Sequence, residues 1–149
     1  MPVYFEGVNS FPLTWPVGWH RTIYYWREQS RFSYDCTIAV AVDFLLDQLR
    51  LLGARNQILS TNLALRLDGL PKSSQRKQED PGVAVYFVLK GEPKVLACDH
   101  WTKVVDNLWA IGKHIEALRG QQSWGVGTLE QAFSGYAALP PPKMVWWEV

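Results

Sequence analysis

The sequence predicts an α+β domain: a small, mainly antiparallel sheet of three strands packed by two long helices, in the order helix, strand, strand, strand, helix, helix. The central strand is residues 83–89, which are apolar at every position, as expected for a strand covered on both faces. The turn residues 90–93 separate it from a second run, 94–98, which is apolar after Lys94, and this spacing predicts an antiparallel hairpin. Apolar residues recur at intervals of three and four in residues 37–52 and 101–119, which indicates the two helices.

Residues 1–32 are expected to form an extended arm, because proline and glycine interrupt them and aromatic residues are interleaved throughout. We expect these rings to cover the core as a lid, since an aromatic side chain buries a large apolar area without regular structure. A second interpretation stays open. Trp15 and Trp19 could offer flat rings to unpaired bases, with nearby cations at Arg21, Arg27 and Arg31.

The first helix has Ser33 or Asp35 as its expected N-cap, runs over residues 37–52 and ends at Gly53. Residues 56–63 follow it and alternate in the two-residue period of a strand. The helix and this strand are therefore expected to precede the central strand.

A long polar connection, residues 66–80, leads from the first strand to the central one and holds the most basic local patch of the chain. Its cations are Arg66, Lys72, Arg76 and Lys77. Long surface connections on a rigid scaffold often carry binding residues. The patch is interpreted either as a solvated loop or as a loop that contacts phosphate or a partner.

The second long helix, over residues 101–119, has Asp99 as its expected N-cap and Gly120 as its stop. Thr128 and Gln131 match the capping-box pattern, which predicts a short third helix.

The composition is that of one globular domain, which we place at 1–139, followed by a proline-rich spacer and apolar tail at 140–149. The net charge of +1 provides no overall attraction to nucleic acid or to an anionic membrane. No secretory leader and no stretch of the roughly 20 apolar residues that span a bilayer is present, so a cytoplasmic protein that does not bind membranes is expected. Cys36 and Cys98 are expected to be reduced thiols.

The chemical motifs are weak. His20, His100 and His114 are too far apart in the chain to indicate a shared metal site, and no glycine-rich phosphate loop follows a strand, so no resident cofactor is expected.

One catalytic alternative remains. The predicted element order is similar to the core of the PD-(D/E)xK nucleases, with Asp80 before the second strand and Glu92-Pro93-Lys94 as the three-residue string. In this alternative, Asp80 and Glu92 hold Mg²⁺ and Lys94 lies beside the attacking water. Glu92 is expected in the hairpin turn rather than in a strand, which counts against it.

Several stretches together resemble the N-terminal region of bacterial and phage J domain-containing proteins. The resemblance covers nearly the whole chain and is carried by Phe11-Pro12-Leu13-Thr14-Trp15-Pro16, Ser60-Thr61-Asn62, Arg66-Leu67-Asp68-Gly69-Leu70-Pro71, Asp80-Pro81-Gly82-Val83-Ala84-Val85-Tyr86-Phe87, Ala97-Cys98-Asp99 and Ile115-Glu116-Ala117-Leu118-Arg119-Gly120. It implies a J domain after the proline spacer, of which Trp146-Trp147-Glu148-Val149 resembles the first helical residues. The His-Pro-Asp motif that acts on Hsp70 does not occur in this sequence.

The sequence therefore favours a non-catalytic recognition or adaptor domain of a phage or mobile-element protein. The expected target is nucleic acid or a nucleoprotein, bound by the basic loop with Trp15 and Trp19 as stacking partners. Delivery of that target to Hsp70 requires an attached J domain. Two other classes stay open: the Mg²⁺-dependent nuclease, and an adaptor or inhibitor that binds only protein.

Overall fold

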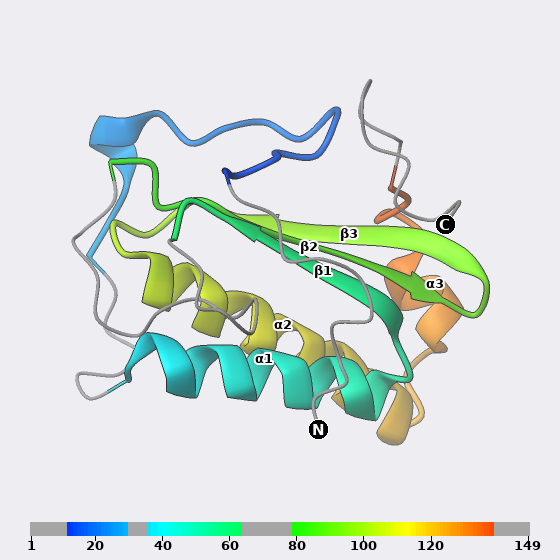
Figure 1. Cartoon of the computed structure of the whole chain (residues 1–149). Coiled ribbons are helices and arrows are strands. Elements are labelled where there is room, and N and C mark those ends of the chain that lie inside the picture. Colours follow the sequence, from blue (N-terminus) through cyan, green and yellow to red (C-terminus); the bar gives the residue numbers. More distant parts are fainter. Residues whose placement is uncertain (1–11, 30–35, 64–78, 139–149) are drawn as a thin grey trace.

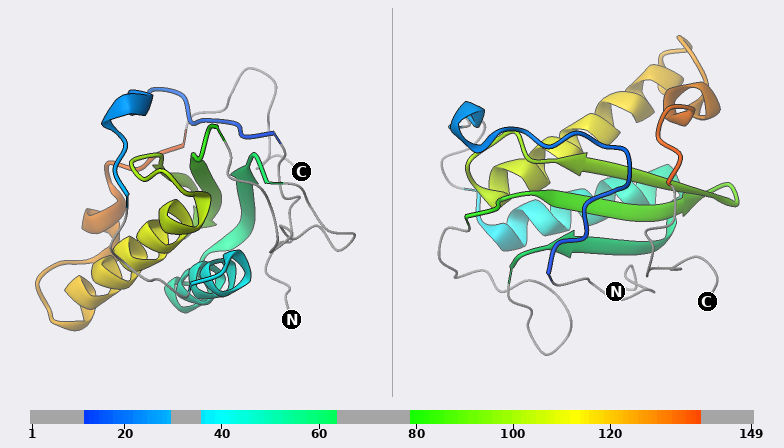
Figure 2. Two further views of the ribbon diagram at one scale, coloured as in Figure 1. Left: turned by 90° about the vertical axis from the view of Figure 1, so that its left-hand side faces the viewer. Right: turned by 90° about the horizontal axis from the view of Figure 1, so that it is seen from above.

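The computed structural model describes residues 12–29, 36–63 and 79–138 of the chain. It confirms the predicted α+β class: one three-stranded antiparallel sheet lies between helices on one face and the N-terminal arm on the other (Figures 1 and 2). The elements, in chain order, are η1 (Tyr24–Trp26), α1 (Ile38–Leu52), β1 (Arg55–Thr61), β2 (Val83–Leu89), β3 (Glu92–Cys98), α2 (Val104–Ser123) and α3 (Leu129–Phe133).

Helix α1 begins one residue later than predicted, because Thr37 is its N-cap and accepts a hydrogen bond from the backbone of Val40 through its hydroxyl. The two residues predicted as caps, Ser33 and Asp35, lie outside the described residues. Gly53 ends the helix as predicted, with a φ of 90° that a side chain would disfavour.

Helix α2 differs from the prediction at both ends. It begins at Val104 with Lys103 as N-cap, so Asp99 does not cap it. It also continues through Gly120 to Ser123, three residues past the predicted stop at 120. The pattern of apolar residues therefore predicted where the helix lies. Asp99, which precedes the helix, accepts hydrogen bonds from Arg21 and Thr22 of the arm instead of capping it.

The sheet has the order β1-β2-β3, with β2 in the centre as predicted. The hairpin between β2 and β3 turns over Lys90 and Gly91 alone, both with positive φ, which is the tight two-residue turn that suits strand twist. Glu92 is therefore the first residue of β3, paired with Leu89, and its predicted place in the turn is wrong.

Two hydrophobic clusters cover the two faces of the sheet. The larger one lies between the sheet and the helices α1 and α2, and it contains Val83, Val85 and Phe87 of the central strand. The smaller one contains Ala84 and Tyr86 of the same strand and packs against the arm. The central strand is thus covered on both faces, as its unbroken apolar sequence predicts.

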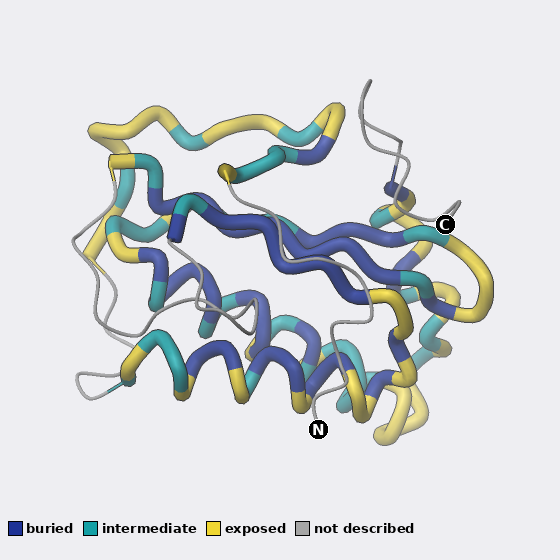
Figure 3. The backbone as a smooth tube through the Cα atoms, in the orientation of Figure 1, coloured by how far each residue is buried: buried dark blue, intermediate teal, exposed yellow. Residues whose placement is uncertain are grey.

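The arm is held on the sheet by specific hydrogen bonds. The backbone N–H groups of Leu13 and Thr14 donate to Asn62 Oδ1 (2.9 Å) and Ser60 Oγ (2.6 Å), both at the end of β1. The Tyr86 hydroxyl donates to Thr14 O (2.8 Å). The arm therefore acts as the predicted lid over the second face (Figure 3).

The chain after α3 returns to the outer edge of β3. The capping box of Thr128 and Gln131 opens α3, as predicted. After the helix ends, Val95 N–H donates to Tyr136 O (3.0 Å) and Ala138 N–H donates to Pro93 O (3.1 Å). This segment protects the first half of the edge strand β3. None of the helices in the described part of the chain is long and apolar enough to cross a membrane.

Candidate functional site

A buried ion-pair cluster lies where β2 begins and β3 ends. Its centre is Asp99, 4 % exposed, which follows β3 directly. The carboxylate accepts hydrogen bonds from Arg21 Nε (2.8 Å), the Thr22 backbone (2.9 Å) and Thr22 Oγ1 (2.7 Å). Burial alone would raise the pKa of Asp99, but the hydrogen bonds from Thr22 and Arg21 outweigh it and hold this pKa below its ordinary value. The buried carboxylate is therefore ionised at neutral pH.

Two arginines of the arm connect this cluster to the start of β2. Arg21 pairs with Asp80 as well as with Asp99, and its guanidinium lies over the Trp15 ring, 4.4 Å from the centroid. Arg27 donates to the backbone oxygen of Asp99 (2.8 Å) and to its carboxylate (3.3 Å). Both arginines are thus used inside the molecule, as positioning groups for the arm.

A buried asparagine fixes the other side of the same region. Asn107 of α2 donates from Nδ2 to Pro81 O (2.8 Å) and Trp101 O (3.1 Å), and its Oδ1 accepts from the Trp101 backbone (3.0 Å). Asn107 Oδ1 also accepts from the Cys98 thiol (3.2 Å). The start of β2, the end of β3 and the first turn of α2 are therefore held together by one side chain.

The segment between the two arginines is the short helix η1, which carries three consecutive exposed aromatic side chains. Tyr24, Tyr25 and Trp26 are 75 %, 66 % and 65 % exposed. Their rings meet edge to face, with centroids 5.5 Å apart for the tyrosines and 5.9 Å for Tyr25 and Trp26. We call these three side chains the η1 surface. The backbone of η1 lies beyond the end of the sheet (Figures 1 and 3).

The η1 surface is fixed on its C-terminal side as well. Glu28 N–H donates to His100 O (3.1 Å), Thr102 N–H donates to Glu28 O (3.0 Å), and the Glu28 carboxylate contacts His100 Nε2 (2.8 Å). Arg27 anchors this same side, and Arg21 and Thr22 anchor the N-terminal side through Asp99. The aromatic side chains are therefore presented by a segment bonded at both ends.

The two tryptophans predicted as stacking partners have internal roles. Trp15 Nε1 donates to Trp19 O (3.0 Å), and one face of its ring lies against Arg21. Trp19 packs against the core with its ring centroid 6.0 Å from that of Tyr136. Both are half-buried members of the lid.

The predicted basic loop residues Arg66, Lys72, Arg76 and Lys77 lie outside the described residues. Their role as contacts for nucleic acid stays a prediction.

The predicted nuclease residues are not brought together. Asp80 precedes Val83 at one end of the β2–β3 hairpin, and Glu92 pairs with Leu89 at the other end. Six strand steps of about 3.3 Å separate these ends by about 20 Å, too far for two carboxylates to share one ion. Lys94 is buried, and its Nζ lies 3.4 Å from Glu92 Oε2. Lys94 is therefore next to Glu92 and not next to Asp80. Within the described ranges, no three His, Cys, Asp or Glu side chains gather as they would to hold a metal.

The thiols and His114 lie in packed surroundings. Cys36 and Cys98 are free, and burial raises the pKa of the Cys98 thiol to about 11, so this thiol stays protonated at neutral pH. His114 Nε2 lies 3.1 Å from the Tyr136 hydroxyl, and burial lowers the pKa of His114. His114 is accordingly neutral at neutral pH.

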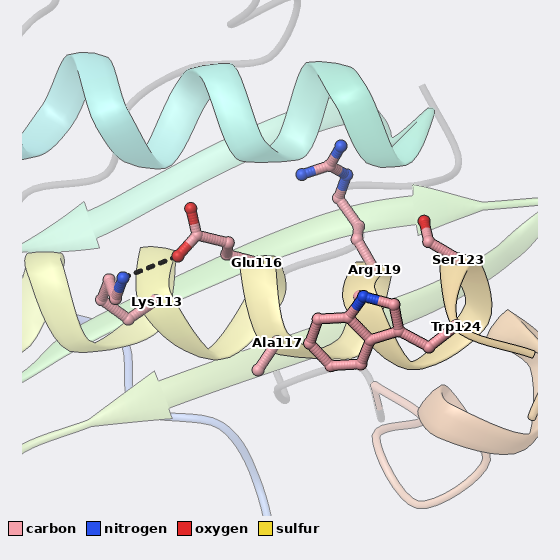
Figure 4. A pocket seen from close by; sticks show the side chains of 7 residues that line it. Lys113, Glu116, Ala117, Arg119, Ser123 and Trp124 are labelled. Atoms are coloured by element: carbon pink, nitrogen blue, oxygen red, sulfur yellow. Dashed lines mark hydrogen bonds and ion pairs between the residues drawn. The ribbon is translucent and has the colours of Figure 1, made fainter. Parts of the chain in front are cut away.

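Two hollows accompany these features. The first, of about 490 Å³, lies beside the last turns of α2, where the ring of Trp124 covers Gly120 (Figure 4). Its two cationic side chains already have partners within the protein. Lys113 Nζ donates to Glu116 Oε1 (2.7 Å), and Arg119 Nη1 donates to Gln48 Oε1 (2.8 Å). The hollow is therefore lined by charged side chains that already have partners and by one exposed aromatic side chain, Trp124.

The second hollow, of about 290 Å³, lies at the outer edge of β3. Its walls come from the arm, from β3, from α2 and from the segment after α3: Trp19, Leu96, Ala97, Cys98, Ala110, Ile111, His114 and Tyr136. We call it the β3-edge cavity.

Tyr24, Tyr25 and Trp26 fall within the predicted aromatic arm, residues 1–32, but were not among the predicted site residues. A signal was present, because three aromatic residues in succession cannot all point into one core, and the charged residues Arg27 and Glu28 follow them directly. Comparison with protein-family models, with curated proteins and with solved structures finds no match to this chain.

Proposed function

We propose that this chain is a non-catalytic recognition module that binds a protein partner through the η1 surface. The observation that carries the proposal is the exposure of Tyr24, Tyr25 and Trp26 on a segment fixed at both ends. Contiguous exposed apolar side chains on a folded domain are typical of interaction sites. Tyrosine and tryptophan are also the residue types that contribute most to the affinity of protein interfaces.

The charges around η1 favour protein over nucleic acid as the partner. Binding to single strands combines aromatic rings with cations that neutralise phosphates. Here Arg21 and Arg27 are paired with Asp80 and Asp99, so their charges are already balanced inside the domain. An aromatic surface of balanced charge matches the centre of a protein interface, where charged residues are depleted.

The fixed position of η1 also favours tight binding. A partner does not have to order this segment when it binds, because the ion pairs of Arg21 and Arg27 and the backbone pairing of Glu28 already do so. Avoiding that ordering cost leaves more of the contact energy available for affinity.

The resemblance to J domain-containing proteins supplies a context for this proposal. In a protein that continues into a J domain, the module would select a client and Hsp70 would act on it. A cytoplasmic location and a phage or mobile-element origin belong to the same proposal.

The test is site-specific photocrosslinking in the producing cell. The photoreactive residue p-benzoylphenylalanine replaces Tyr25 in one version and Val126, which is 75 % exposed on another surface, in the control. We expect a discrete adduct at position 25 that protease removes and nuclease leaves intact, and none at position 126. A nuclease-sensitive adduct at position 25, or equal adducts at both positions, would contradict a protein-binding role for η1.

A further inference from the structure

Strand β3 lies at the edge of the sheet, so alternate residues point their backbone N–H and C=O groups away from β2. Two hydrogen bonds identify the outward residues: Pro93 O accepts from Ala138, and Val95 N–H donates to Tyr136 O. Because the direction alternates along a strand, Ala97 presents its N–H and C=O outward as well.

The chain covers this edge on both sides of Ala97. The segment after α3 pairs with Pro93 and Val95. Beyond the strand, Arg27 donates to Asp99 O, the next outward carbonyl. No residue in the described part of the chain makes a hydrogen bond to the outward groups of Ala97, which is only partly buried. One strand position thus remains open between two protected ones.

The β3-edge cavity opens beside this position. Ala97 itself lines it, together with Trp19 of the arm and Tyr136 of the segment after α3. Helix α2 contributes Ala110, Ile111 and His114. Its volume, about 290 Å³, is at the lower limit of about 300 Å³ found for ligand pockets, so it accommodates one side chain rather than a large ligand.

We propose that the β3 edge binds an extended peptide, which pairs its backbone with Ala97 and places one large uncharged side chain in the β3-edge cavity. An open donor and acceptor in strand geometry complement the backbone of another strand, and added strands take their specificity from side-chain pockets next to the edge. The apolar and aromatic walls, with a neutral His114, exclude a charged side chain.

The geometry of β3 allows a substitution that affects only the outward backbone group of Ala97. Ala97→Pro removes the outward N–H and no bond within the sheet, because that N–H does not point to β2. Proline already occupies the outward position 93 of the same strand. Ala110→Phe fills the cavity from α2. Val40→Phe adds the same ring to an exposed position of α1 and is the matched control.

The experiment selects peptides from a phage-displayed library of random decapeptides on the intact 149-residue chain. Selected peptides are then synthesised and their affinities measured by fluorescence polarisation. We expect binders with one large apolar residue in common. Their affinity should fall about tenfold or more with Ala97→Pro and with Ala110→Phe and stay unchanged with Val40→Phe, as expected when one backbone hydrogen bond or one buried side chain is lost.

A second measurement does not depend on the folding of the variants. On the unaltered protein, a bound peptide should slow hydrogen exchange at the Ala97 amide and shift the NMR signals of Ala97 and His114. The proposal is overturned if no peptide is enriched, if the enriched peptides bind Ala97→Pro with unchanged affinity, or if Ala97 keeps its exchange rate when they bind.

The same peptides separate this site from the η1 surface. The variant Tyr24→Ser/Tyr25→Ser/Trp26→Ser should retain peptide binding if the β3 edge is the site. Peptides that lose affinity with this triple variant but not with Ala97→Pro would support the η1 surface and contradict the peptide site at β3.

Discussion

At the scale of single residues, replacing Asp99 measures how much one buried carboxylate stabilises the end of the sheet. Asp99→Asn would leave Arg21 and Arg27 without their central anion. We expect the free energy of unfolding to fall by about 3 kcal/mol, because removing the buried anion leaves the two arginines with only the partly exposed Asp80 as a partner. Urea denaturation at pH 7 measures the change. Asp47→Asn, at an exposed pair with Arg50, should change it by less than about 1 kcal/mol.

The effect of Asp99 should depend on pH in a defined direction. The pKa of Asp99 is lower in the folded protein than its ordinary value. The carboxylate therefore contributes its stabilisation above the unfolded pKa of about 3.9, and this contribution is lost as the pH falls through the lower folded pKa. The difference in unfolding free energy between the natural protein and Asp99→Asn should be constant near neutrality and shrink in acid. A difference that grows in acid would contradict this assignment.

At the scale of elements, two glycines of α2 should respond oppositely to the same substitution. A Cβ at Gly112 would lie 2.6 Å from the Phe44 ring, which is stacked on Trp109 with centroids 4.2 Å apart. The atoms nearest to a Cβ at Gly120 all belong to the ring of Trp124, a side chain that is 76 % exposed and has solvent to move into. Gly112→Ala should therefore destabilise the protein by about 1–2 kcal/mol after its gain in helix propensity, and Gly120→Ala should stabilise it by about 0.5–1 kcal/mol.

Thermal unfolding by circular dichroism checks this pair. Gly135→Ala is the control, since nothing lies within 4 Å of a Cβ there. Equal shifts at 112 and 120 would show that helix propensity alone governs both positions and that Phe44 yields to the added methyl group.

The positions of the helices and strands could be predicted from local sequence patterns. The ion pairs at the end of the sheet could not. The apolar run of residues 83–89 and the two amphipathic stretches predicted the strand and the helices. The role of Asp99 depends on Arg21, 78 residues away, and on Arg27, 72 residues away. A single sequence carries no signal for that pairing, so an aspartate before a helix was interpreted as its cap.

At the scale of the whole molecule, the arm shows what composition predicts and what it leaves open. A central strand apolar on both faces requires a second cover, and the aromatic arm supplies it. Which rings cover the core depends on where the arm is attached. Hydrogen bonds to Asn62 and Ser60 place Leu13 and Thr14 on the sheet, while the arginine pairs hold η1 beyond its end. Tyr24, Tyr25 and Trp26 therefore remain exposed.

The prediction that the basic loop binds nucleic acid is separate from the proposal that η1 binds a protein, because different residues are involved. If Arg66, Lys72, Arg76 and Lys77 each neutralise one phosphate of a single strand, log Kd should rise with log salt concentration with a slope of about 3. Alanine at all four positions should then weaken binding to labelled single-stranded DNA and RNA and bring the slope close to zero.

The serine variant of the η1 surface separates the two hypotheses when the same strands are titrated against it. If the partner of η1 is a protein, this variant should bind the strands as the natural chain does, at every salt concentration. If the rings stack on bases, affinity should fall by about 1–3 kcal/mol for each base that loses its ring, while the salt slope stays at its original value, because stacking releases no counterions. A natural chain that binds neither nucleic acid at low salt would exclude the basic loop as a contact for single strands and would leave the protein-binding proposal for η1 to the crosslinking experiment.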